Sequence, residues 1–366
     1  MRVLILSLST LLISVNLPAV DFGPRPAKPS NLTVYLTGDS ADAPNQAVGG
    51  PAVLVMGGGT EVDAGFSQQA YPIVNGGDIL VLRTSGSNGY NDYFYNLVTG
   101  PLKPNSVETI LPTTVSKANT DYVEWACDTA EMIWFAGGDQ SDYTSNWRGT
   151  KLQAAVQRAY DRGAVIGGTS AGMDLVSHFI FDPGNGSIPT GATAITNPYI
   201  TGNTITDYFI DSPLMANTIN DAHFFQRDRM GRPLSWMAQL RQDGRTDRII
   251  AIAGDEKSSM FIGNDRIGHV LTGASDRAMY VMWEDGDTTR TQAVAGKALI
   301  YSNVLRTRLT AGGIFDFNTM TGSRNPIRLS VNGGAAPPYT PTDPYTPDEG
   351  PPYPPVGDLA QAFVAY

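Results

Sequence analysis

Short apolar runs separated by helical patterns dominate the chain between about residues 50 and 325. Four runs are continuously apolar, and Gly or Ser follows each of them closely: Ala52–Met56, Ile79–Leu82, Met132–Phe135 and Ala164–Ile166. Continuous apolar strands with glycine near their C-terminal ends are typical of a parallel sheet that is covered on both faces.

A helical pattern lies between the last two of these runs. Thr150 is placed to cap its N-terminus, and Gly163 stands where a left-handed C-terminal residue is expected. This β-α-β pattern predicts an α/β fold with a doubly wound, mainly parallel sheet and helices on both faces. Later apolar runs predict additional C-terminal strands at Ile249–Ala253, Met260–Ile262, Ala278–Trp283 and Ala298–Tyr301.

The two ends of the chain have a different character. Arg2 and the apolar run Val3–Leu17 resemble a secretory signal, so we expect residues 1–19 to be a signal peptide and the protein to be secreted or periplasmic. The alternatives are an uncleaved anchor and a buried first strand. The run is shorter than the roughly 18–20 apolar residues that span a bilayer, and no later segment is apolar enough, so the mature protein is expected to have no membrane span.

Proline-rich segments flank the central region. Residues 20–50 are predicted to be a loose lead-in with one strand at Leu32–Leu36. Nine prolines interleaved with tyrosines occur between Pro337 and Pro355, and such a segment favours an extended chain. We therefore place an α/β domain at 51–330 and a tail at 331–366. The tail is interpreted as a linker or spacer, or else as a ligand for a proline-recognising module or a surface attachment element.

Composition narrows the chemistry. The chain has 366 residues, of which 42% are hydrophobic, so it can form a full-sized core. Its 25 basic and 35 acidic residues give a net charge of −10, which argues against nucleic acid as a partner. A single cysteine, Cys127, excludes an intrachain disulfide. Neither a metal nor another cofactor is expected, because no ligand spacing or phosphate-loop motif is present.

The sharpest local motif is a serine between glycines. Gly168, Ser170 and Gly172 follow an apolar strand and precede a helical pattern that reaches Phe179, which fits a nucleophile elbow. The amide of Ala171 is then a candidate oxyanion donor. A second glycine turn ends another strand, and there the amides of Gly138 and Asp139 are candidate donors. Ordinary structural turns remain the alternative for both motifs.

The general base is sought among three histidines. His178 is predicted to be a packed helix histidine, and His269 lies near a strand pattern. His223 is the favoured base because Asp221 precedes it and arginines follow it. A planar guanidinium suits a substrate carboxylate, and the arginines concerned are Arg227, Arg229 and Arg232.

An acid is expected to orient the imidazole. Asp255 and Glu256 follow the strand Ile249–Ala253, and spacing alone does not decide between them. An α/β-hydrolase esterase remains an alternative, with Ser170, then Asp221 or Asp255, then His269 as the order of the triad. A non-catalytic binding protein for arginine-containing peptides is another.

Together these motifs resemble those of the cyanophycinases and the related aspartyl dipeptidase peptidase E. The resemblance rests on Phe135–Gln140, on Gly167–Gly172 and on Asp221-x-His223 with the arginines that follow. It extends to Val55–Glu61 and to Leu309–Asp316, and so covers about residues 50–318. It implies a fold like that of class I glutamine amidotransferases.

The resemblance also implies roles for single residues. Ser170 would be the nucleophile, His223 the base and Glu256 the acid of the triad, with substrate contacts from Gln140, Asp221, Arg227, Arg229 and Arg232. The implied substrate is cyanophycin, or a related β-aspartyl peptide, and the implied product is the β-Asp-Arg dipeptide. Ala222 stands where the family usually has glutamine, and a homodimer is the candidate assembly.

Overall fold

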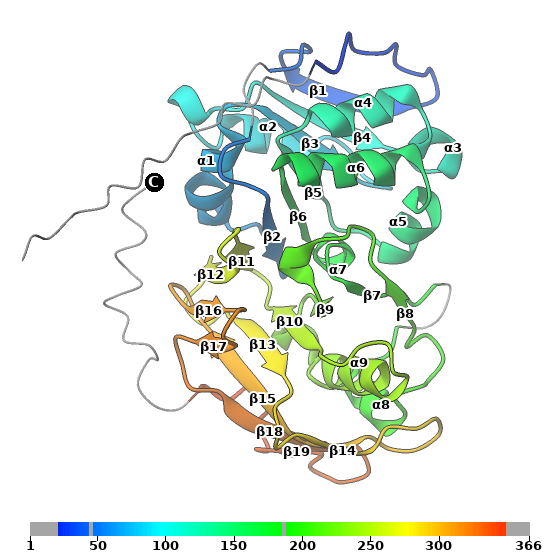
Figure 1. Ribbon diagram of the computed structural model, residues 1–366, viewed down its shortest axis with the longest axis vertical. Helices are drawn as coiled ribbons and strands as arrows, with labels where there is room; N and C mark the ends of the chain where they lie inside the picture. Colours follow the sequence, from blue (N-terminus) through cyan, green and yellow to red (C-terminus); the bar gives the residue numbers. More distant parts are fainter. Residues whose placement is uncertain (1–20, 44–46, 185–187, 349–366) are drawn as a thin grey trace, which may run out of the picture.

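The computed structural model describes residues 21–43, 47–184 and 188–348. The predicted signal peptide at 1–19 lies outside the described residues. Two β-sheets, one of ten and one of nine strands, lie one above the other in Figure 1, and helices cover both. The α/β character predicted from the sequence is therefore confirmed.

The upper sheet has the strand order β1-β4-β3-β5-β6-β2-β11-β12-β16-β17. Its central strands, from β4 to β2, are parallel, and the remaining strands are antiparallel to their neighbours. The parallel strands are β2 (Ala52–Met56), β3 (Asp78–Leu82), β4 (Ser106–Leu111), β5 (Met132–Phe135) and β6 (Val165–Thr169). The others are β1 (Thr33–Gly38), β11 (Ser258–Ile262), β12 (Ile267–Thr272), β16 (Ile314–Asp316) and β17 (Thr321–Gly322).

Helices pack on both faces of the parallel strands. Val53 and Val55 of β2 belong to one buried cluster, with helices α4 (Asp121–Thr129) and α6 (Lys151–Arg162). Ala52, Leu54 and Met56 of the same strand belong to another, with the helical segments η1 (Gly65–Ala70), α1 (Tyr71–Val74) and α2 (Gly89–Asn96). Alternate side chains of a strand point to opposite faces, so continuous apolar runs are needed here. The remaining helical segments of this half are η2 (Gly100–Leu102), α3 (Val115–Ala118) and α5 (Gln140–Trp147).

The lower sheet has the order β19-β18-β15-β13-β10-β9-β7-β8, with β14 paired to β15. Its strands are β7 (Phe179–Phe181), β8 (Ile205–Asp207), β9 (Thr218–Asp221), β10 (Ile250–Gly254), β13 (Met279–Trp283), β14 (Thr289–Gln292), β15 (Ile300–Leu309), β18 (Ile327–Asn332) and β19 (Tyr339–Thr340). Helix α9 (Gly231–Gln242) packs in the core cluster of this sheet. The other helical segments are α8 (Gly191–Thr196), η3 (Pro213–Met215) and η4 (Phe225–Arg227).

The helix after the serine motif is shorter than predicted. Helix α7 spans Ala171–Leu175, and Phe179 begins β7 instead of continuing the helix. The Ser177 hydroxyl lies within hydrogen-bond distance of the carbonyl oxygens of Asp174 and Phe179, which favours a turn between the two elements. The helical position predicted for His178 is wrong for this reason. Its ring lies 5.4 Å from that of Tyr208.

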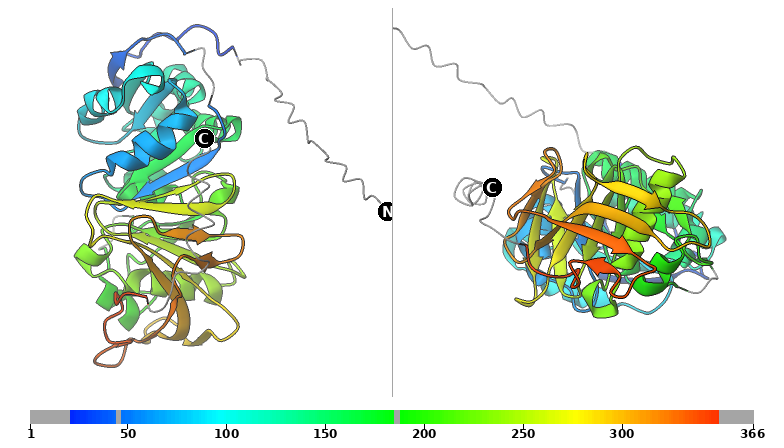
Figure 2. Two further views of the ribbon diagram at one scale, coloured as in Figure 1. Left: turned by 90° about the vertical axis from the view of Figure 1, so that its left-hand side faces the viewer. Right: turned by 90° about the horizontal axis from the view of Figure 1, so that it is seen from below.

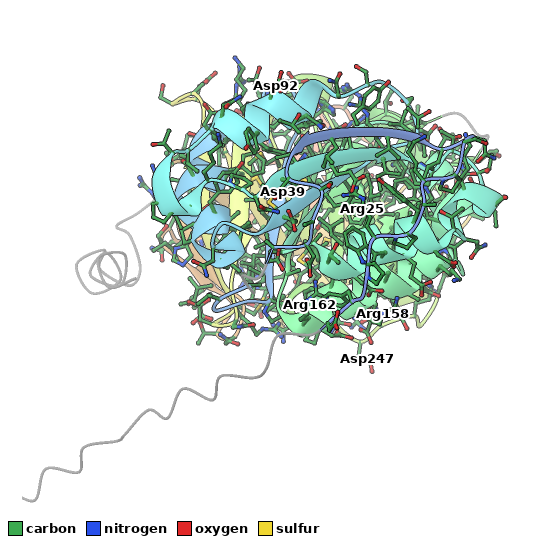
Figure 3. The ribbon with its side chains drawn as sticks, turned by 90° about the horizontal axis from the view of Figure 1, so that it is seen from above. Arg25, Asp39, Asp92, Arg158, Arg162 and Asp247 are labelled. Carbon is green, nitrogen blue, oxygen red and sulfur yellow. The ribbon has the colours of Figure 1, made fainter. Side chains whose placement is uncertain are left out.

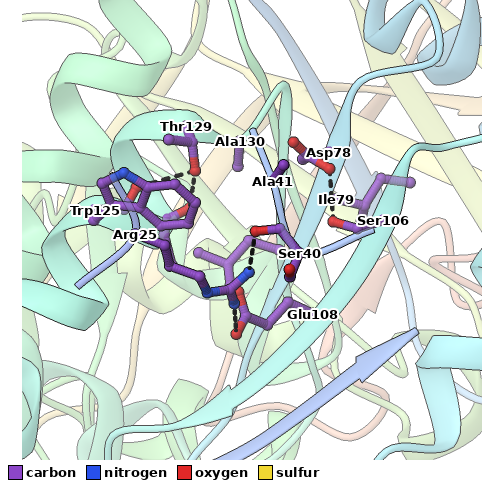
Figure 4. A pocket seen from close by; sticks show the side chains of 12 residues that line it. Arg25, Ser40, Ala41, Asp78, Ile79, Ser106, Glu108, Trp125, Thr129 and Ala130 are labelled. Atoms are coloured by element: carbon purple, nitrogen blue, oxygen red, sulfur yellow. Dashed lines mark hydrogen bonds and ion pairs between the residues drawn. The ribbon is translucent and has the colours of Figure 1, made fainter. Parts of the chain in front are cut away.

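The lead-in segment packs on the upper sheet. Figure 3 labels Arg25 of this segment, and it also labels Arg162. Strand β1 pairs antiparallel with β4 at the sheet edge, close to the strand predicted at Leu32–Leu36. Arg25 forms an ion pair with Glu108 and donates a hydrogen bond to the Tyr122 hydroxyl. Figure 4 shows the cavity beside this ion pair; its volume of about 10 Å³ is room for about one water molecule.

The predicted boundary between residues 330 and 331 is wrong, because it falls inside β18. The proline-rich segment beyond it is also attached to the core: Tyr339–Thr340 forms an edge strand on β18, and Asp348 pairs with Arg306 at 2.5 Å. Proline is tolerated at sheet edges, so composition alone misrepresents this segment as a free tail. Figure 2 shows it, in red, against the lower sheet. In the described parts of the chain, no helix is long and apolar enough to cross a membrane.

Glu131, in the loop before β5, is expected to make the stability of the protein depend on pH. Burial raises the pKa of Glu131 from 4.5 to about 8. The folded protein thus keeps a proton that the unfolded chain releases, so this group lowers the free energy of unfolding as the pH rises from about 4.5 to 8. Gln at this position keeps an oxygen for the hydrogen bond that Glu131 accepts from the Asp78 amide.

We therefore expect Glu131→Gln to gain stability over the wild type between pH 5 and pH 8, by about 2–4 kcal/mol. Urea unfolding at the two pH values measures the gain. A difference between variant and wild type that is the same at both pH values would contradict it.

Candidate active site

The site lies where strand ends of the two sheets meet at the turn after β2. Three consecutive carbonyl oxygens of this turn each accept one backbone hydrogen bond. The Met56 oxygen accepts from the Ser170 amide at 3.1 Å, and the Gly57 oxygen accepts from the His223 amide at 2.7 Å. The Gly58 oxygen accepts from Lys257, the residue after Glu256, at 2.9 Å. One turn thus positions three segments that are far apart in the sequence.

Ser170 stands on a sharp strand-to-helix turn between β6 and α7. Its φ of 55° and ψ of −122° lie in a region that non-glycine residues rarely adopt. A side chain at Gly168 would lie 2.4 Å from the backbone of Gly172, and one at Gly172 would lie 2.1 Å from the Phe135 carbonyl oxygen. The two flanking glycines are therefore required by close backbone contacts.

A chain of two hydrogen bonds starts at the serine. Ser170 Oγ lies 2.7 Å from His223 Nε2, and His223 Nδ1 lies 2.7 Å from Glu256 Oε1. If Nδ1 carries the proton and donates it to the carboxylate, Nε2 is left free to accept from the serine hydroxyl. This arrangement can activate a serine as a nucleophile.

The environment of His223 keeps its imidazole neutral. Burial lowers its pKa, the hydrogen bond that it donates to Glu256 raises the pKa, and the charges of Arg227 and Arg229 lower it again, with a net shift downwards. An ordinary histidine has a pKa of about 6.5, so His223 is a free base at neutral pH.

The structure decides which of the two adjacent acids, Asp255 or Glu256, contacts His223. Asp255 is buried and accepts hydrogen bonds from the backbone amides of Phe225 and Ala278, both at 3.0 Å. Its neighbour Glu256 contacts the imidazole, and the Glu256 amide donates to Gln226 Oε1 at 2.8 Å. Asp255 therefore fixes the loop, and Glu256 is the acid that reaches His223.

The predicted oxyanion turn lies beside the serine. A side chain at Gly137 would lie 3.4 Å from Ser170 Cβ, so the turn that Gly137, Gly138 and Asp139 share passes close to the hydroxyl. Within the described residues, the amides of Gly138 and Asp139 donate no hydrogen bond. Ala171 is the first residue of α7, where helical bonding leaves an amide without an acceptor.

The residues predicted to contact substrate differ in accessibility. Arg227 is exposed, and its guanidinium has no hydrogen bond or ion pair with any described residue. Arg229 is mostly buried and donates to the Asp221 carboxylate at 3.2 Å and to the Ala222 oxygen at 2.7 Å. Gln140 is the first residue of α5, and its Nε2 lies 3.4 Å from Asp174 Oδ2.

Two of these predictions are wrong. Asp221 is fully buried between Arg229 and Arg232, and Arg232 is also buried, with its guanidinium 4.4 Å from the Phe181 ring and 4.8 Å from the Trp236 ring. These charged side chains pair with one another inside the fold, so they do not face a substrate. The esterase order of residues is wrong too, because His223 and not His269 contacts Ser170.

Sequence reasoning missed the glycines after β2 as part of the site. A side chain at Gly58, where φ is 99°, would lie 2.5 Å from His223 Cε1, and one at Gly59 would lie 3.1 Å from Glu256 Cβ. The run of three glycines was the available signal. Asp174 was also missed; it is buried four residues after the nucleophile and faces the charge of Asp221.

A cavity borders the oxyanion turn. It has a volume of about 430 Å³, and its lining includes three acidic residues and one basic residue: Asp139, Asp142, Asp182 and Arg148. Among the residues that the structure describes, no group of three or more His, Cys, Asp or Glu could hold a metal ion.

The contact between Gly58 and His223 can be tested. Gly58→Ala should displace the imidazole and slow the acylation of Ser170 by p-nitrophenyl acetate about 100-fold, because roughly 1 Å of misplacement costs that much. Gly296→Ala is the matched control, since Gly296 also has a positive φ (72°) but no atom within 4 Å of an added side chain. Equal acylation rates for the two variants would contradict the contact.

A comparison with known protein families gives a match to part of the chain. Residues 102–190, which hold the oxyanion turn and Ser170, match peptidase family S51. Among solved structures, the chain is similar to a peptidase from an acI-B1 Actinobacterium, at 17% identity and a TM-score of 0.49, over 74% of this chain and 99% of that one.

It is also similar to a protein of Listeria monocytogenes EGD-e named for peptidase E, at 12% identity and a TM-score of 0.33, over 60% of this chain and 96% of that one. No curated protein matches the chain. The family match over the segment that carries Ser170, together with the hydrogen bonds from Ser170 to Glu256, makes this protein a serine-type peptidase similar to peptidase family S51.

Proposed function

We propose that the protein is a secreted serine exopeptidase that hydrolyses cyanophycin or related β-aspartyl peptides to β-Asp-Arg dipeptides. The observation that carries the proposal is the hydrogen-bonded chain Ser170–His223–Glu256 on a strained strand-to-helix turn. Secretion rests on the signal-like residues 1–19 alone.

The proposed reaction has two steps. His223 Nε2 takes the hydroxyl proton as Ser170 Oγ attacks the scissile carbonyl, and Glu256 stabilises the resulting imidazolium. The amides of Gly138, Asp139 and Ala171 donate to the tetrahedral oxyanion. The imidazolium then gives its proton to the leaving amine, an acyl-enzyme remains, and water activated by His223 releases the acid and restores the serine.

Two features support a substrate that carries both a negatively and a positively charged group. Arg227 is exposed beside the base and offers a planar fork for a carboxylate. Three of the residues that line the cavity next to Asp139 are acidic and one is basic, and carboxylates suit a guanidinium. The β-Asp-Arg unit of cyanophycin carries such groups, and a chain with a net charge of −10 also attracts cationic material.

Release of β-Asp-Arg from purified insoluble cyanophycin tests this function. The mature wild type should release the dipeptide, and Ser170→Ala should reduce the rate at least 1,000-fold, because removal of a nucleophile leaves only binding and oxyanion stabilisation. If neither protein releases the dipeptide, the assignment of cyanophycin as the substrate is wrong, and isoaspartyl dipeptides would then be assayed. Equal release by both would overturn the serine mechanism.

The pH profile of kcat/KM tests the base. The rate should rise as His223 loses its proton, with a midpoint below about 6.5, because the pKa of His223 is lowered by burial. Glu256→Gln removes the interaction that raises this pKa. We expect the midpoint to move to lower pH and the plateau to fall about 100-fold or more, since the imidazole is no longer oriented. A midpoint that moves to higher pH would contradict the assignment of Glu256.

A further inference from the structure

The segment from Tyr339 to Asp348, which we name the C-terminal strap, connects the far end of the lower sheet to the neighbourhood of the site. At its start, Thr340 pairs with Ser330 of β18. At its end, Asp348 Oδ2 accepts from the Arg308 amide at 2.8 Å, near the end of β15 that pairs with β13. Figure 2 shows the strap, in red, against this sheet.

A buried ion pair anchors the end of the strap. The side chains of Arg306 and Asp348 are both 0% exposed and lie 2.5 Å apart, and Asp348 also accepts from the Thr307 hydroxyl at 2.6 Å. Arg306 donates a second hydrogen bond to the Thr346 carbonyl oxygen at 2.6 Å. Charge-assisted hydrogen bonds of this kind hold a chain in one geometry more firmly than neutral ones.

Between these two attachments the strap inserts Tyr345 against the segment that follows His223. The Tyr345 hydroxyl accepts from the Met230 amide and donates to the Asp228 carboxylate, both at 3.0 Å. Its ring lies 5.6 Å from Phe224 and 5.1 Å from Phe225, the two residues directly after the histidine. One side chain thus contacts both ends of the segment from 224 to 230.

Two residues with left-handed backbone lie at the two ends of that segment. His223 has a φ of 49° and Asp228 a φ of 47°, and left-handed backbone at a non-glycine residue is strained. The start of the segment is held by backbone hydrogen bonds from His223 to Gly57 and from Phe224 to Gly254. At its far end, the Tyr345 hydroxyl bonds to both Asp228 and Met230.

We propose that Tyr345 of the C-terminal strap is a positioning residue that holds the His223 segment in the geometry that reaches Ser170. Tyr345 touches no reacting atom and acts through Phe224, Phe225 and Asp228. The inference rests on the proposed function, because it assigns His223 as the base.

Tyr345→Phe tests the proposal, since it removes the hydroxyl and keeps the ring. Tyr339→Phe is the matched control: it lies in the same strap, and within the described residues its hydroxyl makes no hydrogen bond. The measurements are kcat and KM for a β-Asp-Arg substrate, the rate at which phenylmethylsulfonyl fluoride modifies Ser170, and the Tm.

We expect Tyr345→Phe to lower kcat and the modification rate at least fivefold with KM unchanged within twofold, and Tyr339→Phe to change none of them beyond twofold. Asp228→Asn should act through the same hydrogen bond, so the double variant with Tyr345→Phe should be no slower than the slower single variant. A lower Tm with both rates unchanged would overturn the proposal and leave the strap a purely stabilising element.

Failure of the proposed function can be distinguished from failure of the proposal about Tyr345. If the wild type releases no dipeptide but Ser170 is modified, the substrate is wrong and the modification rate still tests the strap. If Ser170 of the wild type is not modified, the proposed function fails, and the imidazole NMR signals then test the strap alone. The chain has three histidines. A His223 signal identical in wild type and Tyr345→Phe would overturn the proposal.

Discussion

The turn after β2 is the constraint on which the site depends. The carbonyl oxygens of Met56, Gly57 and Gly58 accept from the segments that carry the serine, the histidine and the glutamate in turn. Each of these segments ends a different strand, β6, β9 or β10. The turn can approach the histidine and glutamate segments because Gly57, Gly58 and Gly59 lack side chains; an added methyl at Gly58 would overlap His223. Triad geometry is therefore set by main-chain hydrogen bonds between two sheets and is then completed by two side-chain bonds.

Behind the triad lies a buried charged cluster that links the elements around it. Asp221 at the end of β9 pairs with Arg229 and with Arg232 of α9, and Asp174 of α7 faces them. Burial raises the pKa of both carboxyl groups, and the two arginines lower that of Asp221. Removal of one partner from such a cluster leaves an uncompensated buried charge, which costs far more than the pair contributes. The ion pair between Asp221 and Arg232 thus joins α9 to β9, the strand that precedes His223.

The sequence predicted those parts of the molecule that depend on local pattern. The apolar run of β2 has the same bounds as the strand, and Gly163 ends α6 in the left-handed conformation expected of it. It could not decide between Asp255 and Glu256, because neighbouring residues on a loop point in different directions that spacing does not encode. It misplaced Asp221 and Arg232, because a dense charged motif looks the same whether its members bind a ligand or one another.

The proline-rich segment misled for a similar reason. Its composition excludes a helix and a central strand, and this is correct, but composition says nothing about contacts made by single residues such as Tyr345 and Asp348. Those contacts join residues far apart in the sequence, 117 positions for Tyr345 and Asp228 and 42 positions for Asp348 and Arg306. Long-range pairing of this kind is where local pattern carries no information.

The central claim is that Ser170 is a nucleophile activated by His223. Its most direct test is mass spectrometry of peptides from the protein after reaction with a fluorophosphonate, which forms a stable bond only with an activated serine. We expect modification of the peptide that contains Ser170 in the wild type, and its loss in His223→Ala. Modification at another serine, or at Ser170 with equal rates in both proteins, would contradict it.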